Sequence, residues 1–216
     1  MSLTALEAPK HHDHNDRGSR KPRNGIDLLR NEIDLLMKRA VFLDRDGVII
    51  RTNVRDGRPY AITSIDDLEV LEGAEEAISR LRDAGFLVIV VSNQPDVATG
   101  KVERAVVEAI NAKLMECLAI EEIRVCYEAD GPDATCYKPR PGMLLDAAGK
   151  HDIDLSRSYM IGDRWRDVGA GKAAGCVTIF IDCGYVEPSP ENPDIVVDSL
   201  TEAADVILKP EVENGA

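Results

Sequence analysis

Short apolar runs alternate along this chain with longer stretches in which apolar residues recur at helical spacing. Runs such as "FLVIVV" (86–91) and "VTIFI" (177–181) are apolar throughout, which is typical of strands covered on both faces of a sheet. Strands are predicted at 40–43, 86–91, 123–127, 158–161, 177–181 and 194–197. Helices are predicted at 73–84, 102–118, 141–151, 167–174 and 200–208. This alternation predicts an α/β fold, a three-layer sandwich with a central, mainly parallel sheet.

The pattern changes at both ends of the chain. Residues 1–25 are mostly polar and charged and include "HHDH"; we expect a flexible N-terminal extension because so few apolar side chains cannot offset the entropy of ordering. Residues 26–38 have apolar positions at helical intervals and predict an amphipathic helix that docks on the body or on a second copy. The folded domain is expected at 39–209, followed by a tail at 210–216.

Charge and composition exclude several classes of partner. The net charge is −13, so a nucleic-acid backbone is not expected to be the main partner, because such binding relies on basic patches. The sequence has neither an apolar run long enough to span a membrane nor an apolar signal-peptide segment, and we expect a cytoplasmic protein that is a monomer or weak homo-oligomer. The five cysteines are scattered, which favours reduced thiols over a disulfide framework.

Polar residues follow the predicted strands at the points where each strand ends. The first strand runs into Asp44-Arg45-Asp46-Gly47, the second into Ser92-Asn93-Gln94, and the fourth into Gly162-Asp163-Arg164. Lys138 lies in the loop after the third strand, and Asp167 lies one helical turn beyond Asp163. Ligands of open α/β sheets bind beyond the carboxyl ends of the strands, so these side chains are expected to share one site.

Phosphoryl transfer to a carboxylate is the chemistry that fits this set. Asp44 is the candidate nucleophile and would form an aspartyl-phosphate. Asp46, two residues on, would protonate the leaving oxygen and later activate water. Candidate phosphate and substrate ligands are Ser92, Asn93, Lys138 and Arg164.

A hard divalent cation would relieve the repulsion between the nucleophilic carboxylate and the phosphate. Mg²⁺ is usually held by one or two carboxylates together with phosphate and water. The expected ligands are Asp44, the backbone carbonyl of Asp46, and Asp163, with Asp167 acting through a water molecule.

Four ordered motifs, "FLDRDGVI", "VSNQ", "YKPRPGML" and "IGDRWRDVGAGKAAG", resemble those of the haloacid-dehalogenase (HAD) phosphatase superfamily over residues 40–208. "DRDGVI", "SNQ" and "KPxPGML" are similar to the subgroup of D-glycero-D-manno-heptose 1,7-bisphosphate phosphatases and histidinol-phosphate phosphatases. The resemblance implies the same roles for Asp44, Asp46, Ser92, Lys138 and Asp163, and a site without a large cap domain.

The chain departs from the zinc-binding pattern of that subgroup, which commonly has Cys-x-His followed by Cys-x-Cys. Here these places read Cys126-Tyr-Glu128 and Ala134-Thr-Cys136. Zinc usually takes four Cys or His ligands, so we expect no structural zinc.

Substrate recognition also departs from the subgroup. The resemblance implies an arginine just before Lys138 that contacts the sugar phosphate, but Tyr137 occupies that position. Arg140, Arg164 and Arg55 are candidate replacements. Arg45 is open to two interpretations, a salt-bridge partner that holds the loop or a substrate contact.

The sequence therefore favours a Mg²⁺-dependent phosphatase of a small phosphorylated metabolite, with D-glycero-D-manno-heptose 1,7-bisphosphate as the preferred substrate. Histidinol-phosphate phosphatase, or another sugar-phosphate phosphatase, is the close alternative. Alternatives from other classes are a receiver-like phosphoacceptor domain and a non-catalytic binding protein. Receivers usually carry their acceptor aspartate after the third strand, whereas here the acidic pair follows the first.

Overall fold

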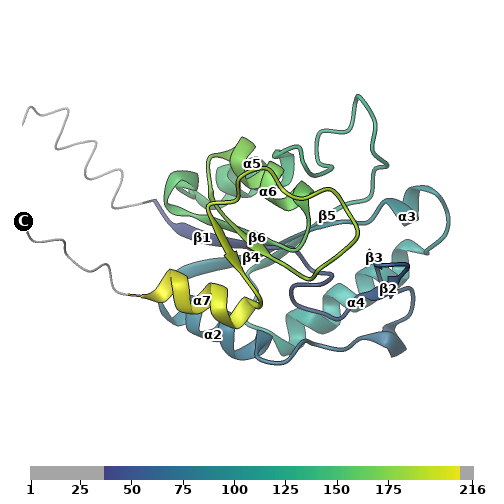
Figure 1. Cartoon of the computed structure of the whole chain (residues 1–216), viewed down its shortest axis with the longest axis horizontal. Helices are drawn as coiled ribbons and strands as arrows, with labels where there is room; N and C mark the ends of the chain where they lie inside the picture. Colours follow the sequence, from purple (N-terminus) through teal and green to yellow (C-terminus); the bar gives the residue numbers. More distant parts are fainter. Residues whose placement is uncertain (1–36, 210–216) are drawn as a thin grey trace, which may run out of the picture.

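A parallel sheet of six strands forms the centre of the molecule, in a computed structural model that describes residues 37–209 (Figure 1). The expectations for residues 1–25, for 26–36 of the N-terminal helix and for 210–216 lie outside the described residues. The strands lie in the order β5-β4-β1-β6-β7-β8, and each neighbouring pair is parallel. Their bounds are β1 Arg39–Leu43, β4 Phe86–Asn93, β5 Glu122–Cys126, β6 Tyr159–Gly162, β7 Val177–Ile181 and β8 Ile195–Val197. The predicted α/β sandwich is confirmed.

Helices cover both faces of this sheet. Their bounds are α2 Ala74–Asp83, α3 Pro95–Ala98, α4 Arg104–Cys117, α5 Gly142–His151, α6 Trp165–Ala174 and α7 Leu200–Leu208, with 3₁₀ turns η1 Ile65–Asp67 and η2 Leu155–Arg157. Side chains of α2, α4 and α7 share one apolar core with Val41 and Leu43. Side chains of α5 and α6 share the other core with Ala40 and Phe42. Successive residues of β1 thus point to opposite faces, as strand geometry requires.

The loop after β1 contains a hairpin that the apolar pattern did not predict. Strands β2 (Asn53–Arg55) and β3 (Arg58–Tyr60) pair antiparallel across the two-residue turn Asp56-Gly57. Both turn residues have positive φ, 50° and 72°, which is the geometry favoured by Asp-Gly in tight hairpins. The strands were missed because their side chains are mostly exposed and carry no apolar alternation.

The expectation that all five cysteines are reduced thiols is wrong for one pair. Cys126, the last residue of β5, is joined to Cys136 by a disulfide, and their Cα atoms are 5.5 Å apart. The loop after β5 returns to the end of that strand, which spacing along the sequence could not reveal. The remaining cysteines are free thiols: Cys117, Cys176 and Cys183. Among the described residues, no helix is both long and apolar enough to cross a membrane.

Candidate active site

The carboxyl ends of β1, β4 and β6 meet at one edge of the sheet. In register, Leu43 of β1 lies beside Val90 of β4 and Ile161 of β6. Asp44, which follows β1, therefore lies between the end of β4, which contains Ser92, and the end of β6, which Asp163 follows. The parallel topology brings together side chains that are more than a hundred residues apart in the sequence.

Three acidic side chains form a buried cluster at this edge. One carboxylate oxygen from each of Asp44, Asp163 and Asp167 lies within 4.8 Å of the others. Both carboxylate oxygens of Asp163 are buried without a hydrogen-bond partner. A Cβ atom placed on Gly47 would come within 1.9 Å of Asp163 Oδ2, so only glycine leaves room for this carboxylate. A cluster of carboxylate oxygens, in which those of Asp163 lack a partner, fits a hard divalent cation such as Mg²⁺.

The protonation of the cluster follows from burial and neighbouring charge. Burial and the negative charges of Asp44 and Asp167 hold the pKa of Asp163 well above its ordinary range. Burial also raises the pKa of Asp167 to about 6, against the positive charge of Lys138 and together with the negative charge of Asp44. Three ionised carboxylates would carry more negative charge than the single lysine neutralises, so a bound cation would favour the ionised forms.

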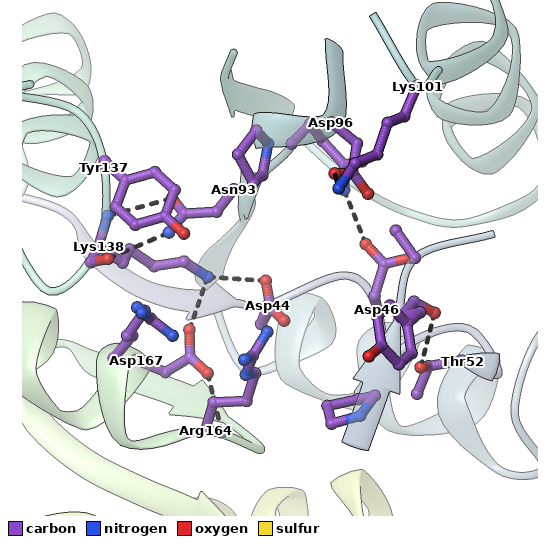
Figure 2. Close-up of a pocket in the computed structure, with 16 residues that line it drawn as sticks. Asp44, Asp46, Thr52, Asn93, Asp96, Lys101, Tyr137, Lys138, Arg164 and Asp167 are labelled. Carbon is purple, nitrogen blue, oxygen red and sulfur yellow. Dashed lines mark hydrogen bonds and ion pairs between the residues drawn. The ribbon is translucent and has the colours of Figure 1, made fainter. Parts of the chain in front are cut away.

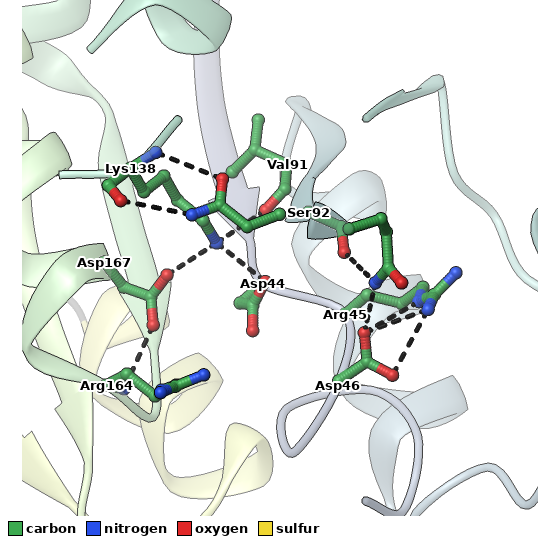
Figure 3. Close-up of polar contacts among 10 residues, drawn as sticks. Asp44, Arg45, Asp46, Val91, Ser92, Lys138, Arg164 and Asp167 are labelled. Atoms are coloured by element: carbon green, nitrogen blue, oxygen red, sulfur yellow. Dashed lines mark hydrogen bonds and ion pairs between the residues drawn. The ribbon is translucent and has the colours of Figure 1, made fainter. Parts of the chain in front are cut away.

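Lys138 supplies the positive charge of the cluster. Its Nζ atom lies 2.7 Å from Asp44 Oδ1 and 2.6 Å from Asp167 Oδ1, and it donates to the Val91 carbonyl at 2.8 Å (Figure 3). Burial alone would disfavour the ammonium form, but the charges of Asp167 and Asp44 raise the pKa of Lys138 above its usual range. The side chain is therefore a fixed cation beside the candidate nucleophile.

The side chain of Asn93 fixes the backbone of Lys138. Its Oδ1 accepts from the Lys138 backbone N–H at 3.1 Å, and its Nδ2 donates to the Lys138 carbonyl at 3.1 Å. The end of β4 thereby fixes the loop that carries the lysine. Ser92 is buried beside Asn93, and its hydroxyl oxygen accepts from Gln94 at 2.9 Å.

Asp46 has different partners from Asp44, although only one residue separates them. Arg45 Nε donates to Asp46 Oδ2 at 3.0 Å, and Gln94 Nε2 donates to the same oxygen at 2.8 Å. Arg45 is fully buried and also donates to Asn111 at 2.8 Å, so it is a salt-bridge partner and not a substrate contact. Burial raises the pKa of Asp46, while the positive Arg45 opposes that shift and the negative Asp44 adds to it. Gln94, for which no motif predicts a role, extends the polar end of β4 by donating to Asp46 and Ser92.

A cavity of about 280 Å³ opens above these groups (Figure 2). The catalytic candidates that line it are Asp44, Asp46, Lys138 and Asp167. The hairpin contributes Pro59 and Tyr60, and the segment around α3 contributes Asp96 and Lys101. Neither segment is a large cap domain, so the walls are built from loops. These wall residues belong to no motif and were therefore not predicted from the sequence.

The arginines proposed as substrate ligands lie in different environments. Arg164 lines the cavity but forms an ion pair with both carboxylate oxygens of Glu187. Arg140 pairs with Asp130, and Arg55 lies over the Tyr60 ring; neither is among the residues that line the cavity. Arg166, which was not predicted from the sequence, lines the cavity together with Tyr137.

The expected absence of zinc stays a prediction. The ligand atoms of Cys126, Glu128 and Cys136 lie within 4.8 Å of one another. The two sulfur atoms are bonded to each other, however, so neither is a thiolate ligand in this structure. Three such groups also fall short of the usual four ligands of structural zinc.

Known proteins resemble this chain in sequence and in fold. The profile of the HAD-hydrolase-like family matches residues 135–203. A D-glycero-beta-D-manno-heptose-1,7-bisphosphate 7-phosphatase from Pseudomonas aeruginosa is 34% identical, over 81% of this chain and 100% of the relative. A D-glycero-D-manno-heptose-1,7-bisphosphate 7-phosphatase from Thermosynechococcus vestitus is also 34% identical, over 78% of this chain and 94% of the relative.

Among solved structures, a D,D-heptose 1,7-bisphosphate phosphatase from B. bronchiseptica, complexed with magnesium and phosphate, superposes with a TM-score of 0.64. It is 28% identical, and the match covers 79% of this chain and 98% of that one. The catalytic edge, the four motifs and these relatives agree, and the chain belongs to the heptose-bisphosphate phosphatase family of HAD-like hydrolases.

Proposed function

We propose that this phosphatase hydrolyses D-glycero-D-manno-heptose 1,7-bisphosphate, or a closely similar phosphorylated sugar, through an aspartyl-phosphate at Asp44. The observation that carries the proposal is the buried cluster in which one carboxylate oxygen from each of Asp44, Asp163 and Asp167 lies within 4.8 Å of the others, beside Lys138. The names of the relatives support the choice of sugar. Their phosphatase activity argues against the receiver-like and binding-protein alternatives.

Residues for Mg²⁺ are available between the cavity, which Asp44, Asp46 and Asp167 line, and an adjoining hollow that Asp163 lines. Asp44, Asp163 and the backbone carbonyl of Asp46 would hold the ion, and Asp167 would hold one of its water molecules. When bound, the ion supplies positive charge that offsets the repulsion between the Asp44 carboxylate and the phosphate. The unpaired oxygens of Asp163 are the feature that fits it best.

In the first half-reaction, a carboxylate oxygen of Asp44 forms a bond to phosphorus while the bond from phosphorus to the substrate oxygen breaks. Asp46 gives its proton to that leaving oxygen, a role that its raised pKa favours. Lys138 stays charged and stabilises the negative charge of the transferring group. In the second half-reaction, Asp46 takes a proton from water as the water attacks phosphorus, which releases phosphate and restores Asp44.

The remaining candidate ligands take more specific roles. The Ser92 hydroxyl oxygen already accepts from Gln94, and its own proton is available for a phosphate oxygen. Asn93 fixes the backbone of Lys138, and because it also lines the cavity, the second N–H of its amide is assigned to the substrate. Arg164 donates its backbone N–H to Asp167 at 3.0 Å, so we assign it the task of orienting that carboxylate.

We further propose a small phosphorylated metabolite as the only class of partner, with the enzyme acting in the cytoplasm as a monomer or weak homo-oligomer. The net charge of −13 supports the exclusion of nucleic acid. Disulfides are rare in reducing compartments. A Cys126–Cys136 disulfide that is intact in the cell would therefore argue against the cytoplasmic location.

The proposal is tested by measuring kcat/KM for both anomers of the heptose bisphosphate, for histidinol phosphate and for a panel of other sugar phosphates. We expect one heptose bisphosphate anomer to be preferred, because specificity is a ratio of these constants. A preference for histidinol phosphate, or for a sugar phosphate of another class, would contradict the substrate assignment.

The nucleophile is tested in parallel with Asp44→Asn. We expect Mg²⁺-dependent phosphate release to fall by about 10³-fold or more, because the amide cannot form the aspartyl-phosphate. Asp83→Asn, a change at an exposed carboxylate at the end of α2, is the matched control and is expected to leave the rate unchanged. Activity near that of the wild type in Asp44→Asn would remove Asp44 from the mechanism.

A further inference from the structure

The cavity above the catalytic aspartates is lined by cations, and their partners differ. Lys138 is held by Asp44 and Asp167, Lys101 pairs with Asp96, and Arg164 pairs with Glu187. Arg166 also lines the cavity, yet within residues 37–209 it has no ion pair with a carboxylate and no hydrogen bond. One lining cation is therefore available for a ligand.

The surroundings of Arg166 hold its guanidinium in place. Its Cζ atom lies 4.6 Å from the centroid of the Trp165 ring and 5.8 Å from that of Tyr137. Aromatic faces attract a guanidinium and restrict its orientation without occupying its N–H donors. The Nε atom is shielded from solvent and has no hydrogen-bond partner. A buried donor without an acceptor costs free energy, so the free enzyme has an unsatisfied hydrogen-bond donor at Arg166.

The nearby carboxylates are paired with other cations and do not accept a hydrogen bond from Arg166. Glu187 uses both oxygens on Arg164, and Asp96 faces Lys101 at 3.1 Å. Arg166 lies in the first turn of α6, beside Asp167, where the helix dipole also favours negative charge. A second cation, Arg58 of the hairpin, lines the adjoining hollow together with Arg166 and Trp165. An acceptor must therefore come from the ligand, and it must be anionic to use the site fully.

We propose that Arg166 is a specificity-determining residue that binds a second anionic group of the substrate, remote from the phosphoryl group that Asp44 attacks. This inference rests on the proposed phosphatase function and deepens it. It assigns the substrate to phosphorylated polyols that carry a second phosphate or a carboxylate. In this chain Tyr137 precedes Lys138, and its ring supports the arginine that reaches the cavity from α6. A substrate whose remote end is cationic, such as histidinol phosphate, does not match it.

The test compares substrates with and without a second anion in Arg166→Gln. For heptose 1,7-bisphosphate we expect KM to rise about 10- to 100-fold, because hydrogen bonds to a charged group are lost. For 4-nitrophenyl phosphate, which has no second anionic group, we expect kcat and KM to stay within about 2-fold. That second substrate also reports whether the variant is folded. Arg166→Lys keeps the positive charge but loses the planar, two-pronged donor group of arginine. Its KM for the bisphosphate is expected to lie between those of the wild type and Arg166→Gln.

Arg140→Gln is the matched control, because Arg140 pairs with Asp130 and is not among the residues that line the cavity. We expect both substrates to behave as in wild type. Equal losses on both substrates in Arg166→Gln, or an unchanged KM for the bisphosphate, would overturn the inference.

Failure of the heptose assignment is distinguishable from failure of this inference. If wild type prefers another compound, each good substrate is compared with its analogue lacking the second anionic group. Selective loss in Arg166→Gln would still support the anion site. If the wild-type enzyme prefers the analogues that lack the second anionic group, the inference about Arg166 is overturned, whichever sugar is turned over.

Discussion

At the scale of single residues, Asp44 and Asp46 have different partners, which suit the different roles proposed for them. Asp44 lies against Lys138, whereas Asp46 is held by Arg45 and Gln94. Both are carboxylates of similar intrinsic acidity, so their difference comes from what each one faces. The raised pKa of Asp46 suits a group that must donate a proton, and the fixed positive charge beside Asp44 suits a nucleophile. Gly47 completes the arrangement because its missing side chain leaves room for Asp163.

Gly47→Ala tests whether the missing side chain of Gly47 leaves room for the Asp163 carboxylate. The added methyl group would overlap Asp163 Oδ2, so we expect the carboxylate to be displaced and the Mg²⁺ concentration for half-maximal activity to rise about 10-fold or more. The measurement is phosphate release titrated with Mg²⁺.

Gly85→Ala is the matched control for backbone strain. Gly47 and Gly85 have φ values of 90° and 85°, but a Cβ atom on Gly85 would meet nothing within 4 Å. Both variants should lose about 1 kcal/mol of stability, and only Gly47→Ala should change the Mg²⁺ requirement. The same Mg²⁺ response in both would assign the effect to strain alone.

At the scale of elements, the loop between β5 and α5 is the segment that delivers Lys138. It is tied to the sheet at two points: the Cys126–Cys136 disulfide, and the paired hydrogen bonds between Asn93 and the Lys138 backbone. The first connects the loop to β5 and the second connects it to β4. The long loop thus holds its lysine in place without secondary structure of its own.

The disulfide predicts a thiol count and a stability change. Denatured, unreduced protein should titrate with three thiols and not five, because only Cys117, Cys176 and Cys183 are free. Cys136→Ser should lower the free energy of unfolding by about 2 to 3 kcal/mol, since the crosslink restricts the unfolded chain over a separation of 10 residues. Chemical denaturation measures this change.

Cys117→Ser, at an exposed free thiol on α4, is the control and should leave stability nearly unchanged. Zinc analysis before and after reduction belongs to the same experiment. Five titratable thiols together with stoichiometric zinc would show that Cys126, Glu128 and Cys136 hold a metal and not a disulfide.

At the scale of the whole molecule, folding concentrates negative charge at one edge of a sheet. Asp163 and Asp167 are each 2% exposed, and Asp44 is 7% exposed. Apolar packing on both faces of the sheet places them there, because the strands that carry them are held in register by the two cores. Burying these three carboxylates together is therefore electrostatically unfavourable until a cation binds.

This unfavourable burial predicts how stability depends on pH when metal is absent. The pKa values of Asp163 and Asp167 are raised, the latter to about 6, so between the ordinary aspartate value and that point the folded state binds more protons than the unfolded state. The free energy of unfolding should therefore fall as pH rises from about 5 to about 7.5, by on the order of 2 kcal/mol. Chemical denaturation in chelator, repeated across this range, measures the slope.

Saturating Mg²⁺ should stabilise the protein more at pH 7.5 than at pH 5, because the ion binds the ionised carboxylates. Asp167→Asn should flatten the metal-free slope. Glu122 and Asp194 have lowered pKa values, so their ionisation makes the free energy of unfolding rise with pH. That rise occurs below about pH 5, outside the range that is measured. Metal-free stability that rises between pH 5 and 7.5 would contradict the assignment.

The apolar pattern alone determined the order of the main strands and helices, because strands buried on both faces need continuous apolar runs. The acids at the strand ends were predictable for a related reason, since parallel strands all deliver their carboxyl ends to one edge. Asp44, Asp46, Lys138 and Asp163 could therefore be named before their positions were known.

Only the tertiary structure decided which side chains face one another across that edge. Asn93, which the sequence predicts to bind substrate, also holds the backbone of Lys138, and Arg45 proved to be a buried partner of Asp46. The disulfide, the exposed hairpin and the availability of Arg166 likewise depend on how loops return to the sheet. Periodicity reports which face of an element is buried, but contacts between loops distant in sequence leave no periodic signal.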